Sequence, residues 1–205
     1  MDLSLPYIAQ LTFQHLFLSL LGTLTGGLIG FVLAICVRRQ PGLASVLIGL
    51  AEIIQTIPGI ALLAFLLLAF GLGNTTLVIG LALYAILPVL QNTYEGLAAV
   101  DPVYLDIGKG MGMTPGEIFR QIELPLAFPV ILAGLRVSLV TSIGIATIGV
   151  FVGADGLGTV IYRGLQIIDM QTMLAGAIPA ALLAVLLEVA LSLATRKAAK
   201  TTLQR

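Results

Sequence analysis

The sequence predicts an all-α integral membrane protein with five transmembrane helices, and three observations support this prediction. Hydrophobic residues make up 59% of the 205 residues, and the mean hydropathy is +1.10. Charged residues make up only 10%, whereas soluble domains usually carry roughly 25%. Several long apolar segments approach or exceed the roughly 20 residues that a helix needs to cross a bilayer. The chain is interpreted as a single transmembrane domain, 1–205.

The expected spans cover residues 16–37, 44–70, 75–90, 125–152 and 172–194. The third is short for a span, and the second and fourth are long. A polar loop is expected at 91–124 and a second connecting segment at 153–171. No Lys or Arg precedes the first apolar run, and a cleaved signal peptide needs a positively charged start, so the first span is expected to be retained.

The distribution of Lys and Arg predicts the orientation, because short loops rich in these residues stay in the cytoplasm. Five spans place eight of the ten on one side; the other two are Arg136 within the fourth span and Arg163 in the 153–171 segment. The N-terminus is therefore predicted outside and the C-terminus inside. The eight residues are Arg38, Arg39, Lys109, Arg120, Arg196, Lys197, Lys200 and Arg205.

Capping signals predict two short helices within the 91–124 loop. Asp101 followed by Pro102 is typical of a helix start, and the glycines at 108, 110 and 112 favour a helix stop. Thr114 followed three residues later by Glu117 fits a capping box, and the second helix is expected to end before Pro125. A solvated connection is one interpretation of this segment. Its length favours the other, a docking element for a cytoplasmic partner.

The spacing within this loop resembles that of the permease subunits of ATP-binding-cassette (ABC) importers. Their cytoplasmic loop has the pattern Glu-Ala-Ala, three residues, Gly, nine residues, Ile-x-Leu-Pro. Here Asp106-Ile107-Gly108, Gly112 and the run from Ile122 to Pro125 occupy the same places. The resemblance extends over nearly the whole chain and looks closest to the osmoprotectant permeases, in stretches such as IIQTIPGIALLAFL at 53–66 and LPLAFPVILAGLR at 124–136.

The resemblance implies a type I importer-like fold and a bacterial or archaeal inner-membrane location. It implies a non-catalytic subunit for glycine betaine, choline or carnitine, with ATP and Mg bound by a separate ATPase. Further implied partners are a second permease copy or paralogue, an extracytoplasmic binding protein and membrane lipid, and no nucleic acid. The residues expected to couple to the ATPase are Tyr104, Leu105, Asp106, Gly108, Gly112, Ile122, Leu124 and Pro125.

Three ionisable residues are expected within the membrane: Glu52, Arg136 and Glu188. Such residues are costly in lipid and are usually paired or functional. Arg136 is expected to pair with Glu52 or with Glu188 and to fix the packing of the spans. The alternative is an arginine that extends its side chain to the inner membrane surface.

Gln55, Thr56 and Pro58 interrupt the second span. A proline removes one backbone hydrogen bond and kinks a helix, and broken polar helices often line translocation paths. These residues are therefore candidates for the substrate path, and a polar contact between helices is the alternative.

The segment GADGLG provides candidates for an outer gate or a binding-protein docking surface: Gly153, Asp155, Gly156 and Gly158. A simple glycine-rich turn is the alternative, and a short helix is expected over 159–166. Asp155 stands where the resembling permeases usually have glycine. In the first span, glycines at 22, 26 and 30 predict a smooth face for close helix packing, and His15 is expected at the outer interface.

No catalytic constellation and no His/Cys cluster is visible, so neither an enzyme site nor a metal site is expected. The main alternative to an osmoprotectant permease is an ABC permease for methionine or another small amino-acid-like solute. A self-sufficient secondary transporter or channel, and a membrane scaffold or enzyme, are more distant alternatives.

Overall fold

The computed structural model describes residues 4–203, and it describes side-chain surroundings for residues 4–195. Every regular element in the described range is a helix. The elements are α1 (Leu5–Val37), α2 (Pro41–Thr56), α3 (Gly59–Phe70), α4 (Asn74–Ala98), α5 (Pro102–Gly110), α6 (Pro115–Ile118), the π-helical η1 (Phe119–Glu123), α7 (Leu124–Ala146), the 3₁₀-helical η2 (Thr147–Val152), α8 (Leu157–Ile167) and α9 (Met170–Leu203).

Four helices in the described range are long and apolar enough to cross a membrane: Leu5–Val37, Asn74–Ala98, Pro115–Val152 and Met170–Thr195. Helices α2 and α3 form a fifth span if they are counted together, although the chain bends by 97° between them. The structure therefore agrees with five predicted spans when this broken pair is counted as the second one. Helix α4 continues to Ala98, so the start of the predicted loop belongs to the span.

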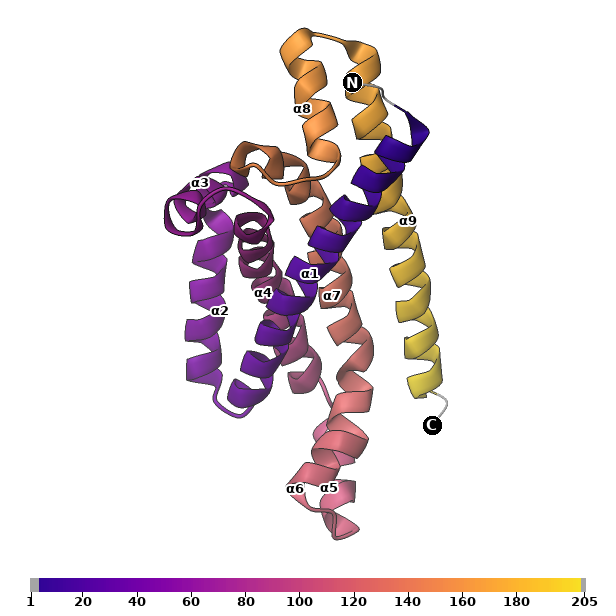
Figure 1. The fold of residues 1–205 in the computed structure, drawn as a ribbon. Helices are drawn as coiled ribbons and strands as arrows, with labels where there is room; N and C mark the ends of the chain where they lie inside the picture. The colour runs from indigo at the N-terminus through magenta and orange to yellow at the C-terminus, as the bar shows by residue number, and fades with distance from the viewer. Residues whose placement is uncertain (1–3, 204–205) are drawn as a thin grey trace.

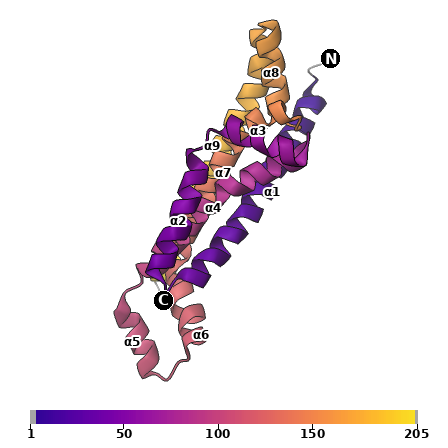
Figure 2. The ribbon, with the colours of Figure 1, turned by 90° about the vertical axis from the view of Figure 1, so that its left-hand side faces the viewer.

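The spans form an elongated bundle in which α1, α4 and α7 lie in the middle, with α2 and α3 on one side and α9 on the other (Figure 1). The α5–α6 hairpin projects from one end, and α8 with the turn into α9 projects from the opposite end (Figures 1 and 2). Arg38 follows α1 at the hairpin's end of the bundle. The predicted cytoplasmic residues Arg196, Lys197, Lys200 and Arg205 lie outside the residues whose side chains are described.

The glycine face predicted in the first span packs directly against α4. A Cβ atom on Gly26 would lie 2.0 Å from the backbone oxygen of Ala82, and one on Gly30 would lie 2.6 Å from that of Ile86. A Cβ on Gly22 would lie 2.5 Å from the Cβ of Leu81. The prediction of close helix packing is confirmed, because any side chain at these positions would push the two helices apart.

The expectation that His15 lies at the outer interface is wrong, because the side chain is fully buried at 0% exposure. The reason lies at the end of α7, where the backbone tightens into η2. The N–H of Thr147 donates to Gly144 instead of Ile143, so the Ile143 carbonyl loses its usual helical donor. His15 Nε2 lies 3.0 Å from that oxygen and donates to it. The histidine therefore satisfies a buried carbonyl that the change of helix type leaves free.

Candidate functional site

The first helix of the hairpin begins as its capping signal predicts. The Asp101 carboxylate accepts a hydrogen bond from the backbone N–H of Val103 at 2.9 Å, and Pro102 is the first helical residue. Helix α5 then runs to Gly110, and Gly112 follows with φ +79°. Glycine adopts this left-handed conformation without strain, so the predicted glycine stop is confirmed at Gly112.

The second helix begins with the predicted capping box. The Thr114 hydroxyl accepts from the N–H of Glu117 at 3.4 Å, and the Glu117 carboxylate accepts from the N–H and the hydroxyl of Thr114, each at 2.7 Å. These hydrogen bonds hold the pKa of Glu117 below its ordinary value, the Thr114 hydroxyl contributing most. The start of the second helix is therefore fixed by a charged, solvent-exposed cap.

The expectation that this second helix ends before Pro125 is wrong. Helix α6 passes through η1 directly into α7, so residues 115–152 form one continuous helical stretch whose first part, 115–123, belongs to the hairpin that projects from the bundle. In η1 the N–H of Leu124 donates to the carbonyl of Phe119, five residues earlier. Pro125 has no N–H and would crowd the carbonyl four residues before it in an α-helix. The wider π turn accommodates the ring, so the hairpin is continuous with the span.

Packing between α5 and the second helix centres on Gly108, which is buried. A Cβ atom at this position would lie 3.0 Å from Ile122, 3.2 Å from Ile118 and 3.4 Å from Met113. Gly108 and Ile122, both predicted coupling residues, therefore hold the two helices of the hairpin together. This is a structural role that the spacing alone did not reveal.

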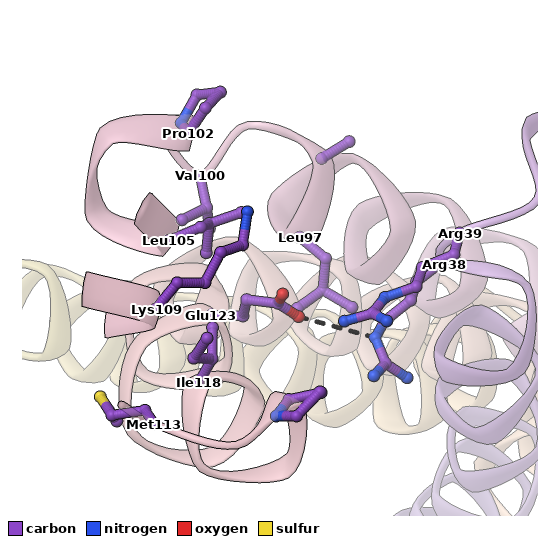
Figure 3. A pocket seen from close by; sticks show the side chains of 12 residues that line it. Arg38, Arg39, Leu97, Val100, Pro102, Leu105, Lys109, Met113, Ile118 and Glu123 are labelled. Carbon is purple, nitrogen blue, oxygen red and sulfur yellow. Dashed lines mark ion pairs between the residues drawn. The ribbon is translucent and has the colours of Figure 1, made fainter. Parts of the chain in front are cut away.

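Arg38, at the end of α1, connects the bundle to the base of the hairpin. Its Nε lies 3.6 Å from Glu123 Oε2, and its guanidinium carbon lies 4.4 Å from the centre of the Phe119 ring. Figure 3 shows this ion pair at one edge of a cavity of about 630 Å³ between the bundle and the hairpin. Leu105 of α5 and Ile118 of α6 face the same cavity.

The outward face of α5 is apolar and exposed. Val103, Tyr104, Ile107 and Met111 are each more than half exposed, between 52% and 68%. Asp106 and Lys109 form an ion pair at 2.9 Å on the same helix and are also exposed. Of the four apolar residues, the predicted coupling set included Tyr104 but not Val103, Ile107 or Met111, and it also included Asp106. The 103, 107, 111 spacing is the helical signal that identifies them. Such a face is typical of a protein–protein contact surface.

The remaining predicted coupling residues lie between the hairpin and the span. Leu124 and Pro125 form the start of α7, where Leu124 is partly buried and Pro125 is exposed. Gly112 lies exposed at the turn, and a Cβ atom there would meet nothing within 4 Å. The structure thus brings all eight predicted residues into the hairpin and its attachment, but only some of them onto its outer surface.

The break in the second span is held together by hydrogen bonds to α4. Pro88 leaves the carbonyl of Tyr84 without its helical donor, and Gln55 Nε2 donates to that carbonyl at 3.0 Å. The Tyr84 hydroxyl in turn donates to the carbonyl of Ile57 at the bend. Thr56 makes only a local bond to Ile53, at 2.7 Å, and Pro58 precedes α3. Gln55 therefore fixes the bend, while Thr56 and Pro58 remain exposed.

The charged residues within the spans are arranged more specifically than the sequence indicated. Arg136 Nε lies 3.6 Å from Glu188 Oε1, which joins α7 to α9. Glu52 lies on α2, away from this pair, and makes no ion pair among the described residues. Of the two partners expected for Arg136, the structure places Glu188 beside it.

The outer segment folds against the turn between α3 and α4. Asn74 and Asp155 exchange two hydrogen bonds, and the N–H of Gly73 donates to Val152 at 2.7 Å. Gly153 and Gly156 have positive φ values of 71° and 136°. The short helix expected over 159–166 is present as α8.

Gly156 and Gly158 also allow close packing around the outer segment. A Cβ atom on Gly156 would lie 2.9 Å from His15 Nδ1, and one on Gly158 would lie 2.0 Å from the Thr147 carbonyl. The four predicted gate residues therefore lie together, in a tightly packed turn. Among the described residues, no three His, Cys, Asp or Glu side chains are placed to hold a metal ion.

These features define a class of protein: a helical membrane subunit with a broken second span and a hairpin that presents an apolar face at one end. The family described as "Binding-protein-dependent transport system inner membrane component" matches residues 8–200. The chain belongs to this family, whose members are non-catalytic inner-membrane permeases of ABC importers.

Curated relatives from two genera are similar over most of their length. The chain is 45% identical over 181 residues to the glycine betaine/carnitine/choline transport system permease protein OpuCD of Bacillus subtilis (strain 168), covering 88% of this chain and 79% of OpuCD. It is 46% identical over 186 residues to the carnitine transport permease protein OpuCD of Listeria monocytogenes, covering 90% and 83%. It is 40% identical to the choline transport system permease protein OpuBB of Bacillus subtilis, covering 95% and 89%.

Solved structures show the same fold. An inward-facing structure of the MetNI methionine ABC transporter matches with a TM-score of 0.82 at 22% identity, covering 95% of this chain and 99% of that chain. A crystal structure of an amino acid ABC transporter with histidines matches with a TM-score of 0.77 at 21% identity, covering 94% of each chain. At these identities the likeness establishes the fold and not the solute.

Proposed function

We propose that this chain forms the translocation path of an ATP-driven importer for quaternary ammonium solutes such as glycine betaine, choline and carnitine. The observation that carries the proposal is 40–46% identity, over 88–95% of the chain, to permeases that are named for these solutes. The methionine alternative has only structural support, since the MetNI likeness is at 22% identity.

The exposed face of α5 is proposed as the docking surface, or seat, for the ATPase subunit. It offers Val103, Tyr104, Ile107 and Met111 as a compact apolar surface, and apolar residues form the centre of most protein interfaces. Because α6 is continuous with α7 through η1, a displacement of the hairpin would be transmitted to this span. Hydrolysis of ATP in the partner would therefore move the helices here without any chemistry in this chain.

The opposite end is proposed to receive the solute from an extracytoplasmic binding protein. The turn that contains Gly153 and Asp155 lies there, beside the turn before α4. A second copy or a paralogue would complete the path, with Thr56 and Pro58 exposed at the bend of the broken span. Opening of the outer turn and movement of the hairpin would then occur at opposite ends of the same bundle.

Uptake by the reconstituted transporter tests this proposal. The chain is assembled in proteoliposomes with its ATPase and binding protein, and uptake of labelled glycine betaine, choline, carnitine and methionine is measured with and without ATP. ATP-dependent uptake of a quaternary amine is expected. Uptake of methionine alone, or of none of these compounds, would overturn the assignment.

Gly112→Asp tests the coupling surface in the same assay. An aspartate at φ +79° strains the turn and adds a charge beside the proposed ATPase seat, so ATP-driven uptake is expected to fall about tenfold or more. Gly112→Asn isolates the charge, because asparagine has nearly the same shape as aspartate and tolerates this conformation about as well, and it should retain more uptake. Gly42→Asp, at another exposed glycine with open space around it, is the control. Full uptake by Gly112→Asp would contradict the proposed seat.

A further inference from the structure

Glu52 remains without a partner at a depth where a carboxylate is costly. Arg136 pairs with Glu188 instead, and Glu52 makes neither an ion pair nor a hydrogen bond among the described residues. Helix α2 begins at Pro41, which places Glu52 roughly 16 Å along the helix axis. Yet the residue is exposed. An exposed, unpaired carboxylate at this depth indicates that this face of α2 meets water and not lipid.

A cavity of about 380 Å³ lies between this face of α2 and α4, and its lining includes Glu52, Gln91, Tyr94 and Glu95. Glu95 is held on the α4 side by Gln91, whose Nε2 donates to Glu95 Oε1 at 2.9 Å. No Lys or Arg is among the lining residues. The cavity therefore combines two carboxylates from two helices with one aromatic ring and carries no compensating cation.

This combination is suited to a cation that cannot donate hydrogen bonds. A quaternary ammonium group is recognised by the negative faces of aromatic rings and by nearby negative charge. The volume falls within the range usual for small-molecule sites. Ser45 and Gln91 add polar groups to the lining without adding positive charge.

We propose that Glu52, Tyr94 and Glu95 form a waypoint, that is, a weak and transient binding site, for the quaternary ammonium group of the solute in the cytoplasmic half of the translocation path. This inference rests on the proposed function and deepens it, because it assigns the solute's charged group to named residues of the permease. The site is open and carries only two carboxylates, so it should hold the solute weakly. A waypoint must bind weakly, since a solute that bound too tightly would not leave. Glu52 is the specificity-determining residue, because it is the one carboxylate of the cavity without a hydrogen bond among the described residues.

Chemical labelling tests whether this face meets water. In a Cys36→Ser background, which removes the one native cysteine, Glu52→Cys is treated with a trimethylammonium-bearing methanethiosulfonate and with its sulfonate-bearing counterpart. Fast reaction with the cationic reagent is expected, slowed by excess choline. Ile53→Cys, on the same helix but outside the cavity lining, is the control and should react more slowly. Absence of labelling at Glu52→Cys would overturn the inference.

Transport kinetics test the role of the charge. Glu52→Gln is expected to lower the maximal rate of choline uptake about fivefold and that of glycine betaine less, because glycine betaine carries its own carboxylate. The KM should stay unchanged, since the binding protein captures the solute, and Glu52→Asp should retain most of the choline rate. Tyr94→Leu should act like Glu52→Gln, and Tyr94→Phe should act like the wild type.

The outcomes separate this inference from the proposed function. Wild-type uptake of none of choline, glycine betaine and carnitine overturns both. Suppose instead that the wild type takes up both choline and glycine betaine and that Glu52→Gln assembles normally. If the choline-to-betaine ratio of the two proteins is then the same, the waypoint alone is overturned. Where the wild type carries only one of choline, glycine betaine and carnitine, or lacks uptake of either member of the ratio, the maximal rate of a solute that it does carry replaces the ratio, and an unchanged rate in Glu52→Gln overturns the waypoint.

Discussion

Asn74 and Asp155 are 81 residues apart in the chain and exchange two hydrogen bonds at the outer end of the bundle. Asn74 Nδ2 donates to Asp155 Oδ2 at 3.0 Å, and the backbone N–H of Asp155 donates to Asn74 Oδ1 at 2.8 Å. Asp155 therefore has a structural role in the outer segment. The bond from its backbone N–H does not require its side chain, so a glycine at this position would keep that bond.

This asymmetry predicts unequal effects of removing the two side chains. Asn74→Ala removes both hydrogen bonds and should destabilise the outer turn by about 1–2 kcal/mol, whereas Asp155→Ala removes one and should cost about half as much. Asp155→Gly should preserve uptake, because the hydrogen bond from the backbone N–H of residue 155 does not depend on the side chain. Thermal unfolding of the three variants in detergent measures the difference. A larger effect for Asp155→Ala than for Asn74→Ala would show that these two hydrogen bonds do not form as described.

The close approach of α1 and α4 predicts a strong effect at Gly26. Gly26→Ala would place a Cβ 2.0 Å from the Ala82 carbonyl, so the helices must separate, and we expect a loss of about 1–3 kcal/mol of stability. Gly144→Ala is the matched control, because nothing lies within 4 Å of its Cβ position in α7. It should be neutral or stabilising by about 0.5–1 kcal/mol. Melting temperatures of the two proteins provide the comparison, and equal values would contradict the packing.

Local signals in the sequence predicted the hairpin well. Asp101 and Thr114 act on backbone groups two or three residues away, so their effect can be read without knowing the fold. Gly112 similarly permits the positive φ of the turn by its own lack of a side chain. The glycine face of the first span was also predictable, because a spacing of four residues within a single helix places the glycines on one face.

Interactions between distant segments could not be predicted in this way. The burial of His15 depends on the change of helix type after Ile143, and nothing near His15 in the sequence signals this. Gln55 pairs with a carbonyl that Pro88 frees on another helix. The continuity of α6 with α7 depends on a π turn, for which Pro125 alone would have predicted a break.

The ion pair between Arg136 and Glu188 predicts a specific rescue by charge exchange. Arg136→Gln and Glu188→Gln should each lower stability by about 1 kcal/mol, since both side chains are partly exposed and their Nε–Oε1 distance is 3.6 Å. Arg136→Glu combined with Glu188→Arg should recover part of the stability lost by either reversal alone. Arg136→Glu combined with Glu52→Arg is the control and should recover none. Rescue by the second combination would indicate that Arg136 pairs with α2 instead.

The Thr114–Glu117 capping box predicts a pH dependence at the start of the second hairpin helix. The pKa of Glu117 is lowered in the folded protein, chiefly by the Thr114 hydroxyl. A carboxylate with a lowered pKa contributes stability that is complete above the unfolded value, roughly 4.3 for glutamate, and is lost as the pH falls through the folded value. The cap should therefore be intact at neutral pH and weaken only in acid.

Hydrogen exchange at the amides of Glu117 and Ile118 measures this change between about pH 6 and about pH 3, after correction for the intrinsic exchange rate. Protection should fall below about pH 4 in the wild type. In Glu117→Gln it should vary little over this range, because glutamine also serves in a capping box and does not titrate. Glu117→Ala should lose protection at every pH. If the wild type and Glu117→Gln showed the same pH profile, the carboxylate would not be the titrating group that holds this helix start.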